Sequence, residues 1–182
     1  MKIRNRQALI DYVNYGNPVK YLFFWSHRKH GNEVTKSCFS QWYDAPFVAD
    51  GEHFLTAEHY MMYHKALLFN DKAAAKKVLK ASNPGAAKEV GRQVMNFDQK
   101  LWEQNRFGIV VDGNEAKFNA DPELKAFLMG TGNRILVEAS PADRIWGIGL
   151  SGDDPMSNNP NLWKGENLLG FALMEVRDKL TH

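Results

Sequence analysis

Short runs of hydrophobic residues mark the β segments of this chain. The run Tyr21-Leu22-Phe23-Phe24-Trp25 is apolar throughout and predicts a buried strand, and residues 134–138 predict another. Residues 47–48 and 53–54 flank Ala49-Asp50-Gly51-Glu52, which predicts a hairpin because Asp-Gly adopts positive φ readily. Before them, residues 1–19 form a polar lead-in that we expect to lie on the domain as a short helix or strand.

Most of the remaining chain carries helical patterns that begin at capping residues. We expect six helices: 56–69, 71–81, one that opens at Pro84, 98–118, 121 to 130 or 132, and 166–180. Residues 139–164 form a long loop rich in Gly, Asp, Asn and Pro, and loops of that length are often functional. The expected fold class is mainly α with a few short strands.

Composition limits the classes of function. A length of 182 residues indicates a single domain, residues 1–182, and 44% hydrophobic residues are enough for a sizeable core. Lys and Arg total 23 against 21 Asp and Glu, a net charge of +2 that argues against broad binding of nucleic acid or anionic membrane. A compact anion, which needs two or three cations, is still allowed.

Compartment and redox chemistry follow from what the sequence lacks. Cys38 is the only cysteine, which excludes an intramolecular disulfide and a zinc site of several thiolates. No apolar run approaches the roughly 18 residues of a membrane span, and the N-terminus lacks the apolar core of a signal peptide. We therefore expect a cytoplasmic protein.

The helix predicted for residues 56–69 carries two charges among apolar side chains. At 100° per residue, one face holds Glu58, Met61, Met62, Lys65, Leu68 and Phe69, and the opposite face holds Tyr60, Tyr63 and Leu67. A helix that is apolar all round is normally buried, and a buried charge is costly unless it is paired or neutralised. Glu58 and Lys65 lie about two turns apart, so their side chains can converge on a substrate between them.

Two interpretations of this pair are open, and spacing alone favours the first. Glu58 can complement the positive end of the helix while Lys65 extends to solvent. Alternatively, desolvation lowers the pKa of Lys65 to give an amine that attacks a sugar C1, and raises the pKa of Glu58 so that it transfers protons near neutrality.

A series of short motifs resembles the NADAR (YbiA-like) family and covers roughly residues 21–180. The motifs are Phe39-Ser40-Gln41-Trp42, Pro46-Phe47, Asp50-Gly51, Thr56-Ala57-Glu58-His59-Tyr60-Met61 with Lys65-Ala66, Gly91-Arg92, Trp102-Glu103, Lys117-Phe118 with Leu124 and Leu128, Trp146-Gly147-Ile148-Gly149, and Gly165-Glu166-Asn167-Leu168-Leu169-Gly170. Two features depart from the family. Gln41 stands where asparagine is common, and residues 151–164 are longer than in the short riboflavin-type members.

The resemblance implies a mainly α-helical YbiA-like domain and an N-glycosidase. Members cleave the base–ribose bond of early riboflavin-pathway intermediates, and others remove ADP-ribose from modified guanine in nucleic acid. A lysine of the shared helix forms a Schiff base with the released sugar. Carried over by motif, this lysine is Lys65 and its acidic partner is Glu58. The implied substrate is a phosphoribosyl or ADP-ribosyl small molecule, or ADP-ribosylated nucleic acid, and no cofactor is needed.

The rival class is a binding module that recognises ADP-ribose or NAD without turning it over. Such a module would not need the pair formed by Glu58 and Lys65, so the presence of both favours an enzyme. Four histidines (His27, His30, His59 and His64) lack a carboxylate at metal-ligand spacing, and no metal site is expected.

Further residues within or near the motifs are candidate substrate contacts, each with a structural alternative. Tryptophans can stack on a base or pack in the core, arginine can bind phosphate or lie on a helix surface, and Asp or Asn can bind ligand or make turns and caps. The candidates are Ser40, Trp42, Arg92, Trp102, Trp146, Gly147, Asp153 with Asp154, and Asn167.

Overall fold

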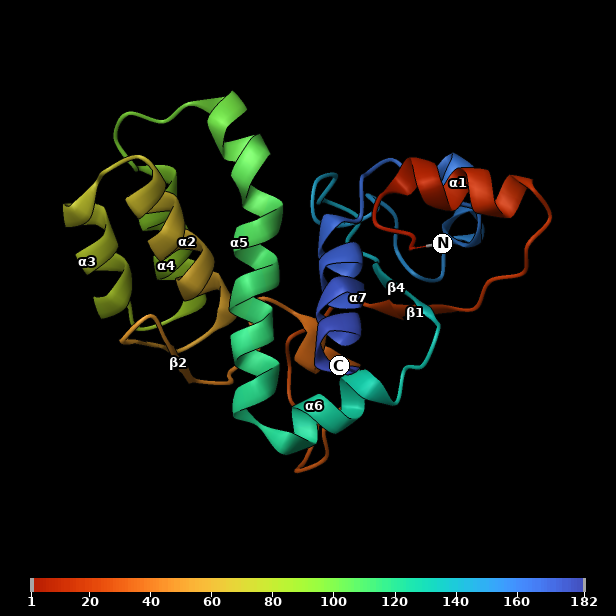
Figure 1. Ribbon diagram of the computed structural model, residues 1–182, viewed down its shortest axis with the longest axis horizontal. Helices are drawn as coiled ribbons and strands as arrows, with labels where there is room; N and C mark the ends of the chain where they lie inside the picture. The colour runs from red at the N-terminus through yellow and green to blue at the C-terminus, as the bar shows by residue number, and fades with distance from the viewer. Residues whose placement is uncertain (1, 182) are drawn as a thin grey trace.

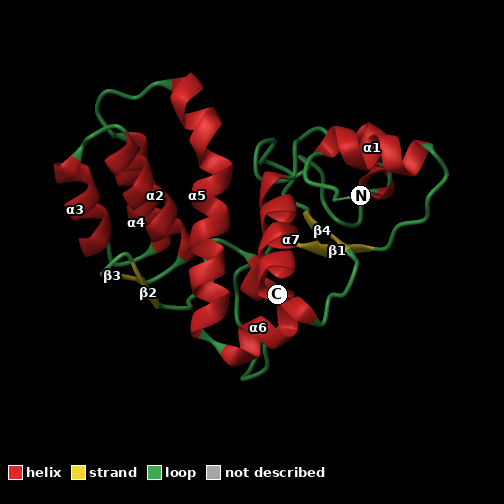
Figure 2. Ribbon diagram, in the orientation of Figure 1, coloured by secondary structure: helices red, strands yellow, loops and turns green. Residues whose placement is uncertain are grey.

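Helices dominate the computed structural model, which describes residues 2–181 (Figures 1 and 2). The α-helices are α1 (Arg6–Asn14), α2 (Ala57–Leu68), α3 (Lys72–Lys80), α4 (Pro84–Arg92), α5 (Gln99–Ala120), α6 (Pro122–Met129) and α7 (Leu168–Thr181). The strands are β1 (Tyr21–Phe24), β2 (Phe47–Ala49), β3 (Glu52–Phe54) and β4 (Ile135–Glu138). Three 3₁₀ helices complete the secondary structure: η1 (Lys36–Phe39), η2 (Pro155–Asn158) and η3 (Pro160–Leu162). The six predicted helices are confirmed, and the lead-in supplies α1.

The helices begin at side chains that accept hydrogen bonds from their first turns. Thr56, Asp71, Asn83, Asp98 and Asp121 cap α2, α3, α4, α5 and α6 in this way. Each cap satisfies amide groups that have no partner within the helix. Local sequence chemistry therefore sets these starts.

The strands form two small pairs. The predicted hairpin is confirmed: β2 pairs antiparallel with β3, and the turn holds Asp50 at φ 53° and Gly51 at φ 78°. Strand β1 pairs in parallel with β4, from Tyr21 beside Ile135 to Phe24 beside Glu138. The strand predicted at this run is present but only partly buried: Phe24 is buried, Tyr21, Leu22 and Phe23 are half-buried, and Trp25 lies beyond β1 and is 57% exposed.

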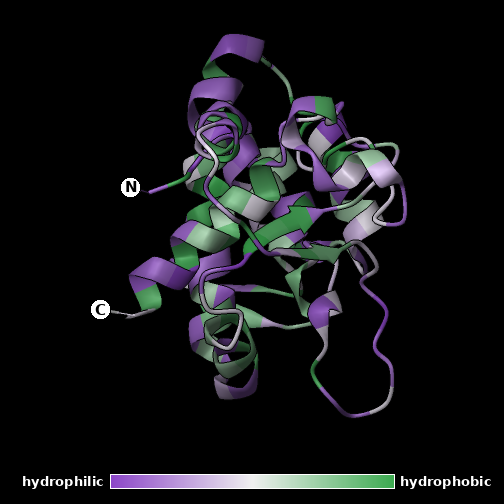
Figure 3. Cartoon of the chain, turned by 90° about the vertical axis from the view of Figure 1, so that its right-hand side faces the viewer, coloured by the Kyte–Doolittle hydropathy of each residue, from purple (hydrophilic) through white to green (hydrophobic). Residues whose placement is uncertain are grey.

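Helix α5 lies between two groups of elements in Figure 1. It contacts α2, which packs with α3 and α4, and on its other side it contacts α7, which packs on β4. Gly113 allows the close approach of α5 to α2, because a Cβ there would lie 2.5 Å from Tyr60 Cδ1. In Figure 3 the strands near the centre are mostly hydrophobic and the outer helix ends mostly hydrophilic.

The long loop after β4 contains short helical turns and contacts the N-terminal helix. It contains η2 and η3, and the buried Trp163 donates from Nε1 to the carbonyl of Ser157 at 2.6 Å. Arg6 of α1 donates to the carbonyl of Pro160 at 3.1 Å, so α1 lies against this loop. Among residues 2–181, every helix is too short or too polar to cross a membrane.

Candidate active site

The first two turns of α2 form one wall of a cavity of about 220 Å³. Glu58, Met61, Met62 and Lys65 line it, so the predicted face of the helix does meet a hollow space. The helix is not buried all round, because Leu67 on the opposite face is 40% exposed. The expectation of burial on all faces is therefore wrong for the last turn of α2, where Leu67 meets solvent although Ala66 and Phe69 are buried.

Glu58 is held in the interior at the start of α2. Its side chain is 4% exposed, and its amide donates to the carbonyl of Gln41 at 3.0 Å, which joins the helix to the Ser40–Trp42 segment. Burial raises the pKa of Glu58 to about 7, against the opposing charge of Lys88. This carboxyl therefore changes its protonation near neutral pH.

Lys65 lies at the partly open side of the same cavity. Its Nζ is 4.8 Å from the ring centre of Phe97 and 5.4 Å from that of Trp102, contacts that hold the amine above two aromatic faces. Burial lowers the pKa of Lys65, and the Glu58 carboxylate opposes this shift. Among the described residues, no ion pair joins Glu58 to Lys65, which leaves space between them in the cavity.

The structure brings five further predicted contacts to this cavity: Ser40, Trp42, Arg92, Trp102 and Trp146. Arg92 at the end of α4 is largely exposed and pairs with Glu89 at 3.3 Å, so it lies at the rim. Lys117 holds the start of the Ser40–Trp42 segment in place, because its Nζ donates to the carbonyls of Cys38 (2.6 Å) and Ser40 (3.0 Å).

Four predicted contacts do not line the cavity. Asp154 caps η2 instead, and its Oδ1 accepts from the amide of Met156 at 2.9 Å. Gly147 packs between the carbonyls of Glu138 and Asp143, where a Cβ would lie within 3.0 Å of both oxygens. Asp153 is exposed and accepts from Ser151 at 2.5 Å. Asn167 is buried, with Nδ2 donating to the carbonyl of Leu136 and Oδ1 accepting from the amide of Glu138, both at 2.9 Å. Asn167 therefore bonds β4 rather than a ligand in this cavity.

Sequence reasoning missed several residues that line the cavity, above all Glu138, the last residue of β4. Burial raises its pKa to about 8, and the charges of Asp143 and Glu58 add to the shift. Within residues 2–181, nothing donates a hydrogen bond to Glu138 Oε2. A glutamate that closes an otherwise apolar strand, just before a long loop, was the available signal.

Asp143 and Lys88 were also missed. Asp143 Oδ1 accepts from the amides of Ile145 and Trp146, both at 2.8 Å, which fixes the turn that presents the Trp146 ring. Lys88 lies one helical turn before Arg92 on α4, and its Nζ is 5.9 Å from the Trp42 ring. Both cations of α4 line the cavity, and Lys88 is the one that lies near Trp42. Gln41 lines the cavity too, and its Oε1 accepts from Asn114 at 2.7 Å.

The histidine of the α2 motif has a structural place. Its Nδ1 lies 2.8 Å from Thr56 Oγ1 and its Nε2 lies 3.0 Å from the Ala81 carbonyl, which satisfies both ring nitrogens of His59. Burial lowers the pKa of His59. Within residues 2–181 the structure contains no group of three or more His, Cys, Asp or Glu side chains arranged to hold a metal ion.

Two carboxyls that titrate near pH 7 to 8, an amine of lowered pKa and three tryptophans thus surround one small cavity. This set can donate a proton, accept a proton and supply a nitrogen nucleophile within one binding space.

Comparison with known proteins adds independent findings. The sequence-family model of the NADAR domain matches residues 23–181 of this chain. The chain is 43% identical over 165 residues to an N-glycosidase of Acanthamoeba polyphaga mimivirus, covering 88% of this chain and 96% of that one. It is 33% identical over 144 residues to N-glycosidase YbiA of Escherichia coli (strain K12), covering 79% of each. The NMR structure of E. coli YbiA superposes with a TM-score of 0.71 at 29% identity, covering 89% of this chain and 85% of that one.

Proposed function

Because this chain belongs to the NADAR family, we propose that it is an N-glycosidase that hydrolyses the bond between a base and ribose in a phosphoribosyl or ADP-ribosyl substrate. The relatives named N-glycosidases support this activity. The observation that carries the proposal is the placement of Glu58, Lys65 and Glu138 around one cavity. Early riboflavin-pathway intermediates, which have a base on a phosphorylated ribose, are the substrate that the family resemblance favours.

The proposed reaction uses Lys65 as nucleophile and the two glutamates for proton transfer. The Lys65 nitrogen bonds C1 of the ribose as the C1–N bond to the base breaks, and the electron pair leaves with the base. The base takes a proton from the Glu138 carboxylic acid, which is protonated at neutral pH because its pKa is raised to about 8. Glu58, as carboxylate, takes the proton that the Lys65 nitrogen loses.

The sugar is then released by water. The ring C1–O bond opens, its oxygen takes the proton back from Glu58, and Lys65 is left as a protonated imine with C1. Water adds to this imine and releases the open-chain sugar and the free amine, and the remaining proton returns to Glu138. One water is consumed for each base released, and both carboxyls and the lysine end in their starting states.

Substrate binding is assigned to the remaining walls of the cavity. Trp42, Trp102 and Trp146 offer ring faces and edges to the base. Arg92 and Lys88 lie one turn apart on α4 and supply positive charge for a phosphate at the rim.

One observation favours the larger ADP-ribosyl substrates as a second candidate. A cavity of about 670 Å³ shares Ser40, Trp42 and Glu138 with the candidate active site and extends to Trp25 and Arg28. This space exceeds what a phosphoribosyl group needs, and it adds a cation and an exposed aromatic ring beside the reacting groups. An ADP-ribosyl group, with its second phosphate and adenine, fits this chemistry.

The test is to incubate the protein with a phosphoribosyl riboflavin intermediate and, separately, with guanine-ADP-ribosylated DNA, and to measure free base and sugar by chromatography. Release in either sample that is lost in the Lys65→Ala protein supports the proposal and identifies the substrate class. Binding of both compounds without release of either product would show that the protein is a binding module.

A further inference from the structure

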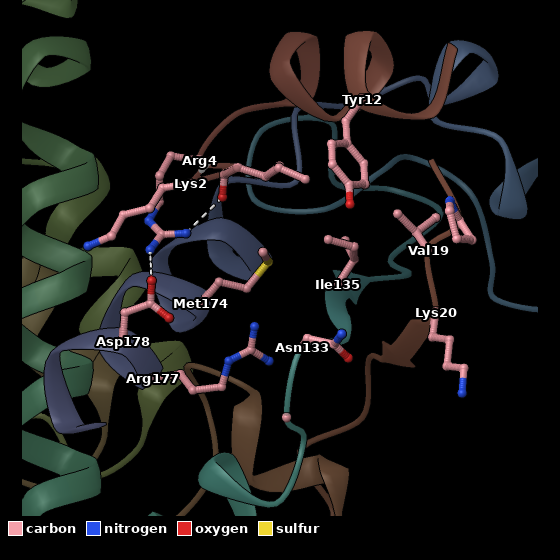
Figure 4. A pocket seen from close by; sticks show the side chains of 13 residues that line it. Lys2, Arg4, Tyr12, Val19, Lys20, Asn133, Ile135, Met174, Arg177 and Asp178 are labelled. Atoms are coloured by element: carbon pink, nitrogen blue, oxygen red, sulfur yellow. Dashed lines mark hydrogen bonds and ion pairs between the residues drawn. The ribbon is translucent and has the colours of Figure 1, made fainter. Parts of the chain in front are cut away.

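A second hollow, of about 550 Å³, lies between the N-terminal segment, the start of β4 and α7 (Figure 4). None of its lining residues belongs to the cavity that holds Glu58 and Lys65. It is lined by four basic side chains, Lys2, Arg4, Lys20 and Arg177, and one acidic side chain, Asp178. The charge of this lining is therefore +3, although the whole chain carries only +2.

Arg177 is the unusual member of this lining. It is 7% exposed, and its Nη1 donates to Thr131 Oγ1 (2.8 Å) and to the carbonyl of Arg134 (3.0 Å). Within the described residues, no acceptor contacts its Nε or Nη2 and no carboxylate pairs with it, while the guanidinium points into the hollow in Figure 4. A buried cation without a carboxylate is costly, and an oxyanion in the hollow would supply the missing partner.

Arg4 does not fill that role, because it carries its own partners. Its guanidinium bonds Glu175 at 2.8 Å and also pairs with Asp178. Lys2 and Lys20, in contrast, are exposed and form no ion pair within residues 2–181. Arg177 is thus the cation that faces a ligand directly, and Lys2 and Lys20 add unpaired positive charge at the edge of the hollow.

The opposite wall of the hollow is apolar. Tyr12 of α1, Val19 and Ile135 of β4 form it, and Figure 4 shows the Tyr12 ring directed towards Ile135, while Met174 lies beside Arg177 on α7. A ligand that contacts both walls needs a charged oxyanion at one end and a flat apolar body at the other. From this geometry we propose that the hollow is a second binding site for a small organic anion, a phosphate or carboxylate attached to an aromatic ring.

Methionine methyl signals can test this site and the catalytic cavity in one experiment. Met174 lines the second hollow, whereas Met61 and Met62 line the catalytic cavity. The full chain is labelled with ¹³C-methyl methionine and titrated with phenyl phosphate, and Met174→Leu assigns the signal. We expect the Met174 signal to move saturably, and inorganic phosphate, which lacks the ring, to bind less tightly.

A matched pair of charge reversals separates a built site from general attraction. Lys20→Glu places a carboxylate at the hollow, and we expect it to weaken phenyl phosphate binding about fivefold or more. Lys100→Glu makes the same change of charge at an exposed position of α5 that lines neither cavity, and it should leave binding unchanged. A Met174 signal that does not shift on titration, shifts confined to Met61 and Met62, or equal weakening of binding by both reversals would overturn the proposal.

Discussion

Replacing Glu138 by glutamine keeps the shape of the side chain and removes the proton that the proposed reaction transfers to the base. Glu138 lines the cavity at the end of β4, and its Oε2 has no hydrogen-bond donor within residues 2–181. The substitution therefore removes no hydrogen bond that a described residue makes to that oxygen. A loss of turnover in Glu138→Gln would report on proton transfer rather than on a damaged fold.

The expected fall in kcat follows from the role of Glu138 as the general acid. A positioned general acid contributes roughly 10²- to 10⁴-fold to the rate, or about 3 to 5 kcal/mol of transition-state free energy. We expect kcat for base release, followed by chromatography, to fall by about 10² or more, with little change in KM. The control is Glu33→Gln, which changes an exposed glutamate of the loop before η1 and should leave kcat unchanged.

The pH profile gives a second measurement of the same role. The acid must hold its proton, so activity should fall as pH rises past about 8, the raised pKa of Glu138. The base must be ionised, so activity should fall as pH drops below about 7, the raised pKa of Glu58. The wild-type profile is then a narrow bell, and Glu138→Gln should lack its alkaline limb.

Stability gives a test that does not depend on turnover. The folded protein keeps the Glu138 proton up to about pH 8, whereas the unfolded chain loses it near the ordinary value of 4.5. The contribution of this group to stability is therefore fully present below pH 4.5 and decreases as pH rises towards 8. The difference between the urea unfolding midpoints at pH 5 and pH 8 should be smaller in Glu138→Gln than in the wild type. A variant with wild-type kcat and an unchanged alkaline limb would refute the acid role.

Four further predictions concern other residues. Borohydride added during turnover should fix a sugar-sized mass on Lys65 and none on the Lys65→Ala protein; mass on a different lysine would contradict the placement of the nucleophile. Glu58→Gln should slow kcat by about 10²-fold, measured by base release. Arg92→Ala should raise KM far more than it lowers kcat, and equal KM for phosphorylated and dephosphorylated substrate would show that no phosphate contact exists. Gly113→Ala should destabilise the fold by about 1 to 3 kcal/mol in urea unfolding, while Gly108→Ala, which has open space at its Cβ on the same helix, should not destabilise it.

Local chemistry made most of the fold predictable from the sequence. Thr56, Asp71 and Asp98 cap the helices that they were expected to begin, because an N-cap depends only on neighbouring residues. The hairpin at Asp50 and Gly51 is local in the same sense. The parallel pairing of β1 with β4 joins segments more than a hundred residues apart, and no local pattern determines such a pairing.

The residues of the candidate site also fall into two groups, those that a local pattern predicts and those that only tertiary packing brings together. Glu58 and Lys65 were predictable as a pair because they share one helix, whose periodicity places them on one face. Lys88, Glu138 and Asp143 come from α4, β4 and the following loop, and they meet α2 only in three dimensions. Lys88 and Asp143 have an ordinary sequence context, and the position of Glu138 at the end of an apolar strand does not show which cavity it lines, so the site could not be assembled before the packing was known.

Two motif residues that do not line the cavity, Gly147 and Asn167, support Glu138, one of the cavity residues that sequence reasoning missed. Asn167, at φ 56°, accepts from the amide of Glu138 with its side chain, and the amide of Ile148 donates to the Glu138 carbonyl at 2.9 Å. Gly147 has no side chain, which lets its segment lie against that same carbonyl. Both backbone polar groups of Glu138 are thus bonded by the motifs around residues 146–149 and 165–170. These bonds fix the backbone of Glu138 at the end of a four-residue strand, and from there its side chain lines the cavity.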